Sequence, residues 1–212
     1  MARQVRWFEL GVDIGLDSLR KYNDIVESHL ESSLVGFECW ADEQASEMGE
    51  EVREEFYEFH SDEYWRLTDV FPTILRSSLF VACYSLLEHE LIGLCRYLYR
   101  QNGYARPPDF RRAYIFEAST YLTDEAGMEF PDVSESWQII KCYYNPIRNV
   151  IVHQRGRIDD RRLRTLKPFI DADPSVSLDS LGRLQLDRAF CSEVLSTLRR
   201  FFRQLFEAVP DL

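Results

Sequence analysis

Three side chains that could act on a phosphate lie close together between residues 147 and 156. Arg148 and Asn149 come just before the apolar run Val150-Ile151-Val152, and His153 follows it. A guanidinium group can hold two phosphate oxygens and oppose the negative charge that develops during attack on phosphorus. An imidazole titrates near neutral pH and can move protons at a hydroxyl or at a leaving oxygen. These residue types suit the cleavage of a phosphodiester bond, and this chemistry requires no metal ion.

RNA is the expected substrate of such a site, because its own 2′-hydroxyl can serve as the nucleophile and leave a cyclic phosphate end. The reaction works best with a separate acid and base, whereas this segment supplies one histidine, His153. A two-fold dimer with two copies of the segment face to face would supply both. We therefore predict a homodimer.

The geometry of a helix separates the three side chains in part. Asn149 and His153 share one face, whereas Arg148 lies about 140° around the axis from His153. Pro146, in the same predicted helix, removes one ladder bond, so we expect a bend at Asn145-Pro146. Either this bend or the long side chain of Arg148 reaching round the helix would let all three point into one cleft. An alternative stays open from spacing alone, because such residues at a helix end often form a capping network.

The spacing of hydrophobic residues predicts an all-α protein, an up-and-down bundle with one small β-hairpin before the last helix. Residues 13–58 fit two helices or one long kinked helix. The most apolar helix is expected from Pro72 to Asn102 and should be central to the core. We divide the chain into an N-terminal helical extension, residues 1–71, and a bundle, residues 72–212.

The second half of the bundle has clear boundary signals. Ser134 can cap a helix that stops at Gly156, and Asp187 can cap the last helix. Between them we expect a basic linker and then a hairpin turning at residues 180–182. The hairpin follows from alternating apolar residues, Val176, Leu178, Leu184 and Leu186.

The net charge of −11 argues at first against a nucleic-acid partner, but the charge is unevenly distributed. Residues 38–63 contain eleven acidic residues and one arginine, a balance of −10, whereas residues 148–167 have a balance of +5. The acidic segment is a solvated helix face or, alternatively, an extension that docks on a basic partner surface. It could also restrain the chain's own basic surface until RNA or a partner displaces it.

The motif Arg148-Asn149-x-x-Val152-His153 followed by Gly156 resembles the signature of the HEPN family, an Arg and a His separated by four to six residues with a polar residue after the Arg. Context for this resemblance comes from residues 84–91, from Tyr121-Leu122 and from Trp137. The resemblance spans residues 72–206 and does not cover the residues before Pro72.

The resemblance implies a helical bundle that dimerises so that paired signatures line one cleft, often with metal-independent endoribonuclease activity in toxin–antitoxin, phage-defence or RNA-processing roles. By position, Arg148 would contact phosphate, His153 would transfer protons and Asn149 would orient one of them. Glu88 is the candidate for an acidic residue that some relatives add, although it could equally be a plain surface or salt-bridged glutamate. Arg155 stands where relatives controlled by nucleotide transfer have a tyrosine, which puts that control in doubt.

The remaining predictions follow from charge and composition and, for a protein partner, from the resemblance to the HEPN family. The RNA-binding side chains are expected in the basic segment, at Arg155, Arg157, Arg161 and Arg162. No apolar run approaches the ~18 residues of a membrane span, and the five scattered cysteines fit a reduced cytoplasmic protein. We expect no metal and no cofactor. The resemblance implies that an antitoxin or other defence-system protein is a possible partner. The alternative function is a non-catalytic HEPN-like dimer that binds RNA or a protein.

Overall fold

The computed structural model describes residues 2–104, 106–111 and 114–209, with side chains from residue 6 onward. Its helices are α1 (Ala2–Ala45), α2 (Glu50–Trp65), α3 (Phe71–Asn102), α4 (Tyr114–Asp124), α5 (Glu135–Ile139), α6 (Asn145–Gln154), α7 (Asp160–Ala172) and α8 (Arg188–Glu207). Two π-helical turns, η1 (Arg66–Val70) and η2 (Ile140–Tyr144), and an antiparallel hairpin of β1 (Val176–Leu178) and β2 (Leu184–Leu186) complete it. The prediction of an all-α protein with a small hairpin before the last helix is confirmed.

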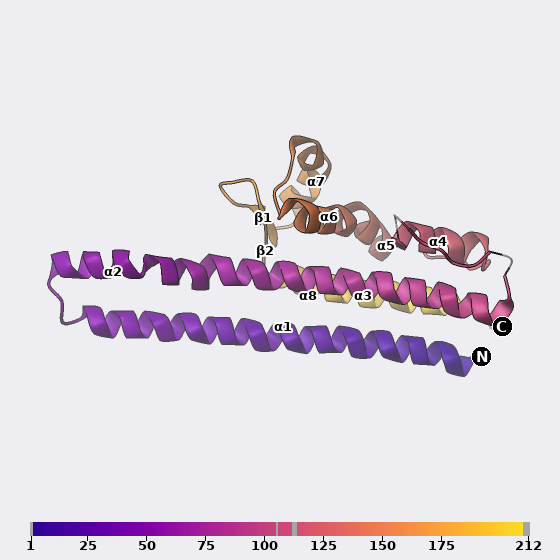
Figure 1. The fold of residues 1–212 in the computed structure, drawn as a ribbon, viewed down its shortest axis with the longest axis horizontal. Helices are drawn as coiled ribbons and strands as arrows, with labels where there is room; N and C mark the ends of the chain where they lie inside the picture. Colours follow the sequence, from indigo (N-terminus) through magenta and orange to yellow (C-terminus); the bar gives the residue numbers. More distant parts are fainter. Residues whose placement is uncertain (1, 105, 112–113, 210–212) are drawn as a thin grey trace.

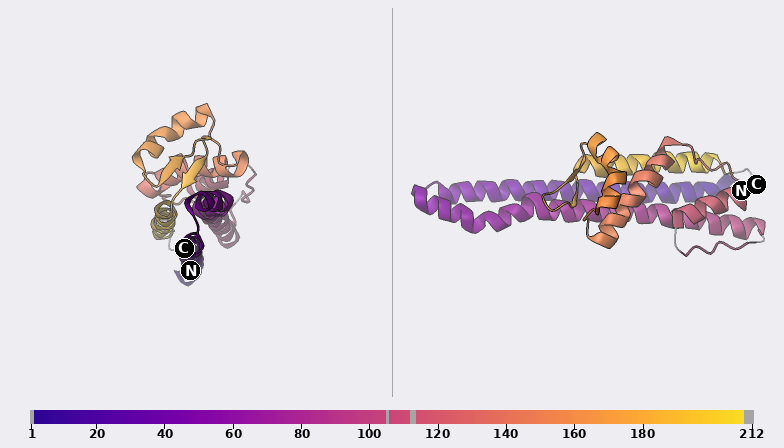
Figure 2. Two further views of the ribbon diagram at one scale, coloured as in Figure 1. Left: turned by 90° about the vertical axis from the view of Figure 1, so that its left-hand side faces the viewer. Right: turned by 90° about the horizontal axis from the view of Figure 1, so that it is seen from above.

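Two long helical rods run antiparallel along the molecule (Figure 1). One is α1; the other is the continuous helix formed by α2, η1 and α3. Helix α8 lies alongside both α1 and α3. Helices α4 and α6 cover another side of α3, α5 packs against α8, and α7 and the β-hairpin lie above α6 (Figure 2). The connection between α1 and α2 lies at the far end of the rods from α4, so that this end projects beyond the other helices.

The core is one cluster of buried side chains centred on α3. Leu87 and Leu91 are fully buried there, as the apolar pattern predicted for this helix. Val12 and Leu16 of α1 belong to the same cluster, and Glu27 of α1 accepts two hydrogen bonds from an α3 arginine. The division at residue 71 stays a prediction: the helix Glu50–Asn102 runs through it without interruption, and α1 shares the core.

Each π-helical turn comes directly before a helix with a proline in its first turn. Pro72 follows η1, and Pro146 follows η2. Proline lacks the N–H that would bond to the carbonyl four residues earlier, and its ring crowds that turn. A wider turn relieves the crowding while the helix continues. The effect expected at Asn145-Pro146 is therefore taken up by the widened turn at residues 140–144.

The segment predicted as a basic linker is a helix instead, and this prediction is wrong. Helix α7 begins after Asp159, whose side chain accepts a hydrogen bond from the backbone N–H of Arg162. Leu166 is fully buried, and Phe169 stacks on Tyr143 with ring centroids 4.3 Å apart. Its high density of arginine hid an amphipathic pattern whose few apolar residues face the bundle.

Both predicted caps are present. The Ser134 hydroxyl accepts from the N–H of Trp137, and the Asp187 carboxylate accepts from the N–H of Phe190 at 2.9 Å.

Asp187→Ala leaves the N–H of Phe190 at the start of α8 unpaired, so we expect it to lower the free energy of unfolding by about 1 kcal/mol in urea denaturation. Asp171→Ala, at an exposed site with one surface ion pair, is the control; equal losses in the two variants would contradict a capping role.

Within the helix Glu50–Asn102, one stretch of 18 residues is apolar enough to cross a membrane, judged by length and composition alone. The core helix of a soluble protein passes the same test, and 39% of this stretch is buried inside the structure.

Candidate functional site

The predicted site lies where α6 packs against α3. On α3, Tyr84 and Glu88 are one turn apart; on α6, Asn145 and Asn149 are one turn apart. The hydroxyl of Tyr84 donates to Oδ1 of Asn145 at 2.9 Å, and Nδ2 of Asn149 donates to the same oxygen at 3.5 Å. Polar side chains four residues apart thus form one network that joins the two helices.

Arg148 extends this network to Glu88. Its Nη1 donates to Oδ1 of Asn149 at 3.2 Å, and its Nη2 lies 3.5 Å from Oε2 of Glu88. The guanidinium carbon lies 5.6 Å from the centre of the Tyr84 ring, within range of a cation–π contact. Neighbouring residues on a helix point in different directions. The side chains of Arg148 and Asn149 are nevertheless in contact, because the long arginine side chain reaches around the helix.

Arg148 is held in place but not saturated. Its side chain is 22% exposed, and its Nε is buried with no hydrogen-bond partner. A guanidinium group carries five N–H donors in a planar fork, and the contacts with Asn149 and Glu88 use two of them. An oxygen-rich anion reaching this group would find donors that the protein itself leaves free.

The Glu88 carboxyl is in a partly dehydrated environment, with a side chain 18% exposed. Burial raises its pKa, and the positive charge of Arg148 partly opposes that shift. Burial likewise raises the pKa of the neighbouring Tyr84 hydroxyl, with the Glu88 charge adding to the shift. A carboxyl with a raised pKa can exchange a proton closer to neutral pH than an exposed glutamate.

The Arg148 charge should matter to stability only while Glu88 is ionised. In Arg148→Ala the opposing charge is lost, so the folded-state pKa of Glu88 rises further above its unfolded value. A raised carboxyl pKa destabilises the fold above the unfolded pKa, and this penalty disappears as pH falls below it. We expect the loss of unfolding free energy to be larger at pH 7 than at pH 4, and this pH dependence to vanish in Glu88→Gln/Arg148→Ala. Losses that are equal at the two pH values would contradict the coupling.

His153 lies in the last turn of α6, one turn beyond Asn149. Helix α6 ends at Gln154 because Arg155 and Gly156 adopt left-handed backbone angles (φ 52° and 81°), which confirms the predicted stop. The imidazole of His153 is exposed and makes no hydrogen bond or ion pair with a described residue. Within one subunit, no hydrogen bond or ion pair between described residues joins it to the Arg148 network. The structure therefore brings Arg148, Asn149 and Glu88 together and leaves His153 at the surface.

The four predicted RNA-binding arginines lie at different places around α6. Arg161 and Arg162, on the first turn of α7, line an open hollow together with Asn145 and Asn149. Arg155 lines another hollow, which α3, α6 and the β-hairpin form. Arg157 is exposed just after α6, and its backbone pairs with that of Arg183 in an isolated antiparallel β-bridge. Two of the four are thus beside the Asn149 side of the network.

The hollow beside α7 has a mixed polar lining. It also contains Asp159 and Thr165, and Nη1 of Arg162 is buried without a hydrogen-bond partner. Asp159 caps α7 and is hydrogen-bonded to Gln154, and these bonds, first the one from the Arg162 N–H, lower its pKa. The hollow therefore combines arginine and asparagine donors with a carboxylate that is already engaged.

Two members of the network, Tyr84 and Asn145, were not among the predicted site residues. A signal for them was present: each precedes a predicted site residue by four positions, Glu88 and Asn149 respectively, so each shares a helix face with it. What the sequence lacked was the pairing of α3 with α6, which sets which faces meet.

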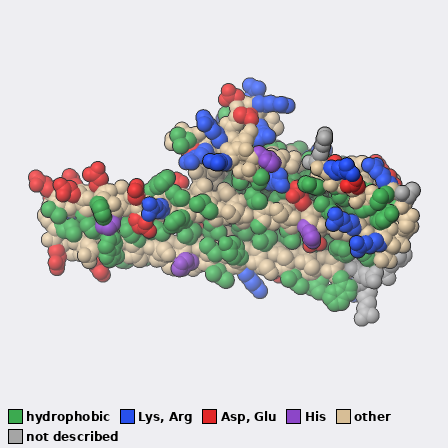
Figure 3. All heavy atoms as spheres, in the orientation of Figure 1, with side chains coloured by type: hydrophobic (Ala, Val, Ile, Leu, Met, Phe, Trp, Pro, Cys, Tyr) green, Lys and Arg blue, Asp and Glu red, His purple; other side chains and the backbone are tan. Residues whose placement is uncertain are grey.

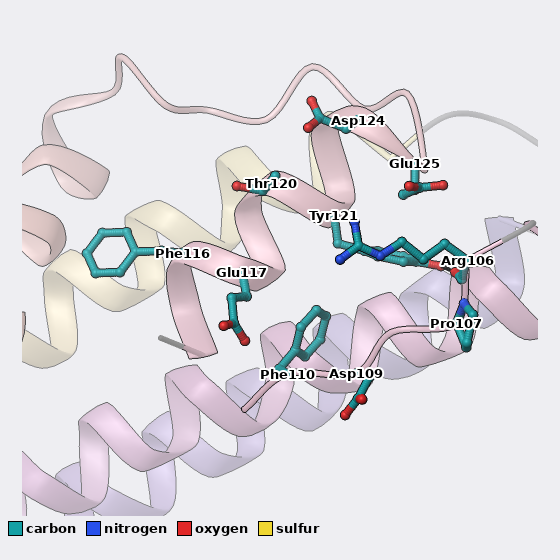
Figure 4. A pocket seen from close by; sticks show the side chains of 10 residues that line it. All are labelled: Arg106, Pro107, Asp109, Phe110, Phe116, Glu117, Thr120, Tyr121, Asp124 and Glu125. Atoms are coloured by element: carbon teal, nitrogen blue, oxygen red, sulfur yellow. Dashed lines mark hydrogen bonds between the residues drawn. The ribbon is translucent and has the colours of Figure 1, made fainter. Parts of the chain in front are cut away.

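A further hollow lies away from this network, between α4 and the loop before it (Figure 4). It is lined by Arg106, Pro107, Asp109, Phe110, Phe116, Glu117, Thr120, Tyr121, Asp124 and Glu125. The rings of Phe110 and Tyr121 meet edge to face at its base, with centroids 6.0 Å apart. None of the predicted catalytic or RNA-binding residues lines it.

Other reactive groups have no comparable arrangement in the part of the chain that the structure describes. No three His, Cys, Asp or Glu side chains are grouped there as metal ligands. Burial raises the pKa of the thiols of Cys83, Cys95 and Cys191 to about 12, which keeps them protonated at neutral pH. The Arg148 network and His153 remain the best-supported candidates for chemistry.

Comparison with known proteins identifies no relative: no family model, no curated protein and no solved structure matches this chain.

Proposed function

We propose that the protein is a metal-independent endoribonuclease that acts as a homodimer. The observation that carries the proposal is the arrangement on α6: Arg148 is held by Glu88 and Asn149 with N–H donors unused, and His153 is exposed one turn beyond Asn149. A positioned guanidinium and an unconstrained imidazole are the two groups that phosphodiester cleavage by the 2′-hydroxyl needs.

In this proposal each group has a defined role. One His153 takes the proton of the 2′-hydroxyl as its oxygen bonds to phosphorus. The second His153, from the partner copy, gives a proton to the departing 5′-oxygen as the phosphorus–oxygen bond breaks, so the products are a 2′,3′-cyclic phosphate and a 5′-hydroxyl. Arg148 opposes the charge on the phosphate oxygens, Asn149 orients Arg148, and Glu88 holds its other end.

The surface around His153 supports contact with a second copy. Val152, next to it, is 44% exposed, and Trp65 and Ile74 are 53% and 58% exposed at the hollow that Arg155 also lines. Exposed apolar side chains that gather around a polar site are typical of interfaces. A two-fold axis through this face would bring the two exposed imidazoles together and cover these side chains.

The proposed RNA path runs over the basic residues that follow the site. Arg155, Arg157 and Arg161 are exposed, and Arg161 and Arg162 adjoin Asn149 in one hollow. Single-stranded or loop RNA would place its backbone phosphates along them. We place the enzyme in the cytoplasm, with a role in a toxin–antitoxin or phage-defence system and an antitoxin or other defence protein as its regulator.

The test is RNA cleavage by the purified protein in the presence of a chelator. We expect cuts in loops of a structured RNA, with cyclic phosphate ends, and no cuts when 2′-deoxynucleotides replace the ribonucleotides at those positions. Cleavage that requires an added divalent ion, or that persists on the deoxy substrate, would exclude this mechanism.

A second function is favoured by the internal contacts of Arg148. Because Glu88, Asn149 and the Tyr84 ring already surround it, the network can serve to hold α3 and α6 together in a dimeric module that binds RNA or a protein without cutting. RNA binding without cleavage, unchanged by replacement of His153, would identify this second function.

A further inference from the structure

The end of the rods where α1 meets α2 buries very little. We call residues 37–64 the hairpin tip. Helix α2 has no buried residue, and the buried residues of α1 in this range are Ala41 and Ala45. Nearer the core, by contrast, α1 is fixed by the bidentate pair of Arg76 with Glu27. Helices in proteins are stabilised mostly by the packing of an apolar face. The tip has few buried side chains that could provide such packing.

Aromatic side chains nonetheless concentrate at the tip. His60 is surrounded by rings, with centroids 4.9 Å from Trp40, 4.6 Å from Phe56 and 5.0 Å from Phe59. Trp40 is 41% exposed and Phe59 is 82% exposed. Clusters of exposed aromatic residues are costly in water and are typical of surfaces that bind another molecule.

A groove runs between α1 and α2 within the tip. Four aromatic rings line it, those of Phe37, Tyr57, His60 and Tyr64, and its polar lining includes Asp42. The Tyr57 hydroxyl donates to Oδ1 of Asp42 at 3.0 Å, which links the two helices across the groove. An apolar floor with a carboxylate edge suits an occupant that is apolar on one side and positively charged on the other.

The charge of the tip narrows the choice of occupant. Acidic side chains gather at this end, whereas Lys and Arg side chains gather over α7 (Figure 3), and residues 38–63 have a balance of −10. Such a surface repels RNA and repels the same tip of a second copy. Among the described residues no ion pair joins the tip to the chain's own basic segment, residues 148–167, so the restraint of that segment within one subunit has no contact to support it.

We propose that the hairpin tip is a docking site for a basic amphipathic helix of a partner protein. The apolar face of that helix would lie in the groove over Phe37, Tyr57 and Tyr64, and its Lys and Arg side chains would pair with the flanking carboxylates and contact the faces of the exposed rings. This site lies apart from Arg148 and His153, and its occupation does not depend on the proposed nuclease activity.

The test uses the full chain and a labelled 18-residue peptide of leucine and lysine at helical spacing, with fluorescence anisotropy as the readout. A peptide of the same composition, scrambled so that no apolar face forms, is the ligand control. We expect the amphipathic peptide to bind at least about tenfold more tightly than the scrambled one. Equal affinities would mean attraction by charge alone and would overturn the proposal.

Two pairs of variants place the binding on the tip. Tyr64→Ser and Glu38→Lys should each weaken binding by at least about fivefold. Their controls are Tyr22→Ser and Glu9→Lys, exposed positions on the part of α1 outside the tip, which should leave binding unchanged. Circular dichroism checks that each variant keeps its helices; a folded Tyr64→Ser that binds like the original chain would overturn the proposal. The proposal would also be overturned if the original chain self-associates and the tip variants do not, because the groove would then bind a second copy of the chain.

Discussion

Replacement of His153 by alanine is expected to lower RNA cleavage by about 10²–10⁴-fold, the contribution of a positioned acid or base to proton transfer. The fold should be unaffected, because this side chain is exposed and makes no hydrogen bond or ion pair with a described residue. Two measurements on the same preparations separate a loss of chemistry from a loss of structure: the cleavage rate under single-turnover conditions and the free energy of unfolding in urea. His89→Ala, at an exposed position on α3, is the matched control and should cleave normally.

Mixing the two forms tests whether the histidines act as a pair. In an equal mixture of original and His153→Ala subunits, after subunit exchange, about one quarter of the dimers carry two imidazoles in the cleft. Residual activity of about one quarter would therefore indicate a shared cleft, whereas about one half would indicate that each subunit works alone. The second value would leave an endoribonuclease but remove the proposed acid–base pair.

The elements that the sequence predicted well are those with strong local signals. Helix α3 carries a wide apolar stripe, and the caps at Ser134 and Asp187 place polar acceptors just before amphipathic runs. Gly156 ended α6 as expected because the chain there needs a left-handed backbone. Each of these features is decided within a few residues of sequence, so the pattern alone was sufficient.

The elements that it predicted poorly depend on distant partners. Helix α7 was predicted as a linker because three arginines and a lysine lie among its few apolar residues. Its stability comes from Leu166 and Phe169 packing on the bundle. The extent of α1 was underestimated for the same reason: Val12 and Leu16 are buried against the rest of the core, which no local pattern reveals. In both cases tertiary contacts override weak local preferences.

The candidate site was predicted as a set of residues but not as an arrangement. Its spacing placed Arg148 and His153 on different sides of α6, and either a bend or the long arginine side chain reaching round the helix was expected to bring them together. Instead the long side chain of Arg148 turns toward Glu88 and Asn149, while His153 stays at the surface. The length of the arginine side chain is known from the sequence, but the group that it meets depends on the pairing of α3 with α6, which a one-dimensional pattern does not show.

Arg148 is the residue at which the catalytic and the structural interpretations differ most. If its guanidinium opposes charge that develops on the phosphate, Arg148→Ala should lower the cleavage rate by about 10²–10³-fold, as the loss of one positioned donor does in other enzymes. The affinity for an uncleavable 2′-deoxy analogue should fall much less, because the interaction strengthens in the transition state. Arg148→Lys keeps the charge but loses the planar fork, so an intermediate rate is expected.

The matched control for Arg148 is Arg155→Ala, an exposed arginine seven residues further on. It should weaken RNA binding, most clearly at low salt, and leave the rate at saturating RNA nearly unchanged, because a contact made equally with the ground state and the transition state does not accelerate the reaction. Suppose instead that Arg148→Ala and Arg148→Lys lose activity only in proportion to the fraction of unfolded protein. The contacts with Glu88 and Asn149 would then account for everything that Arg148 does, and the network would be a device for joining α3 to α6.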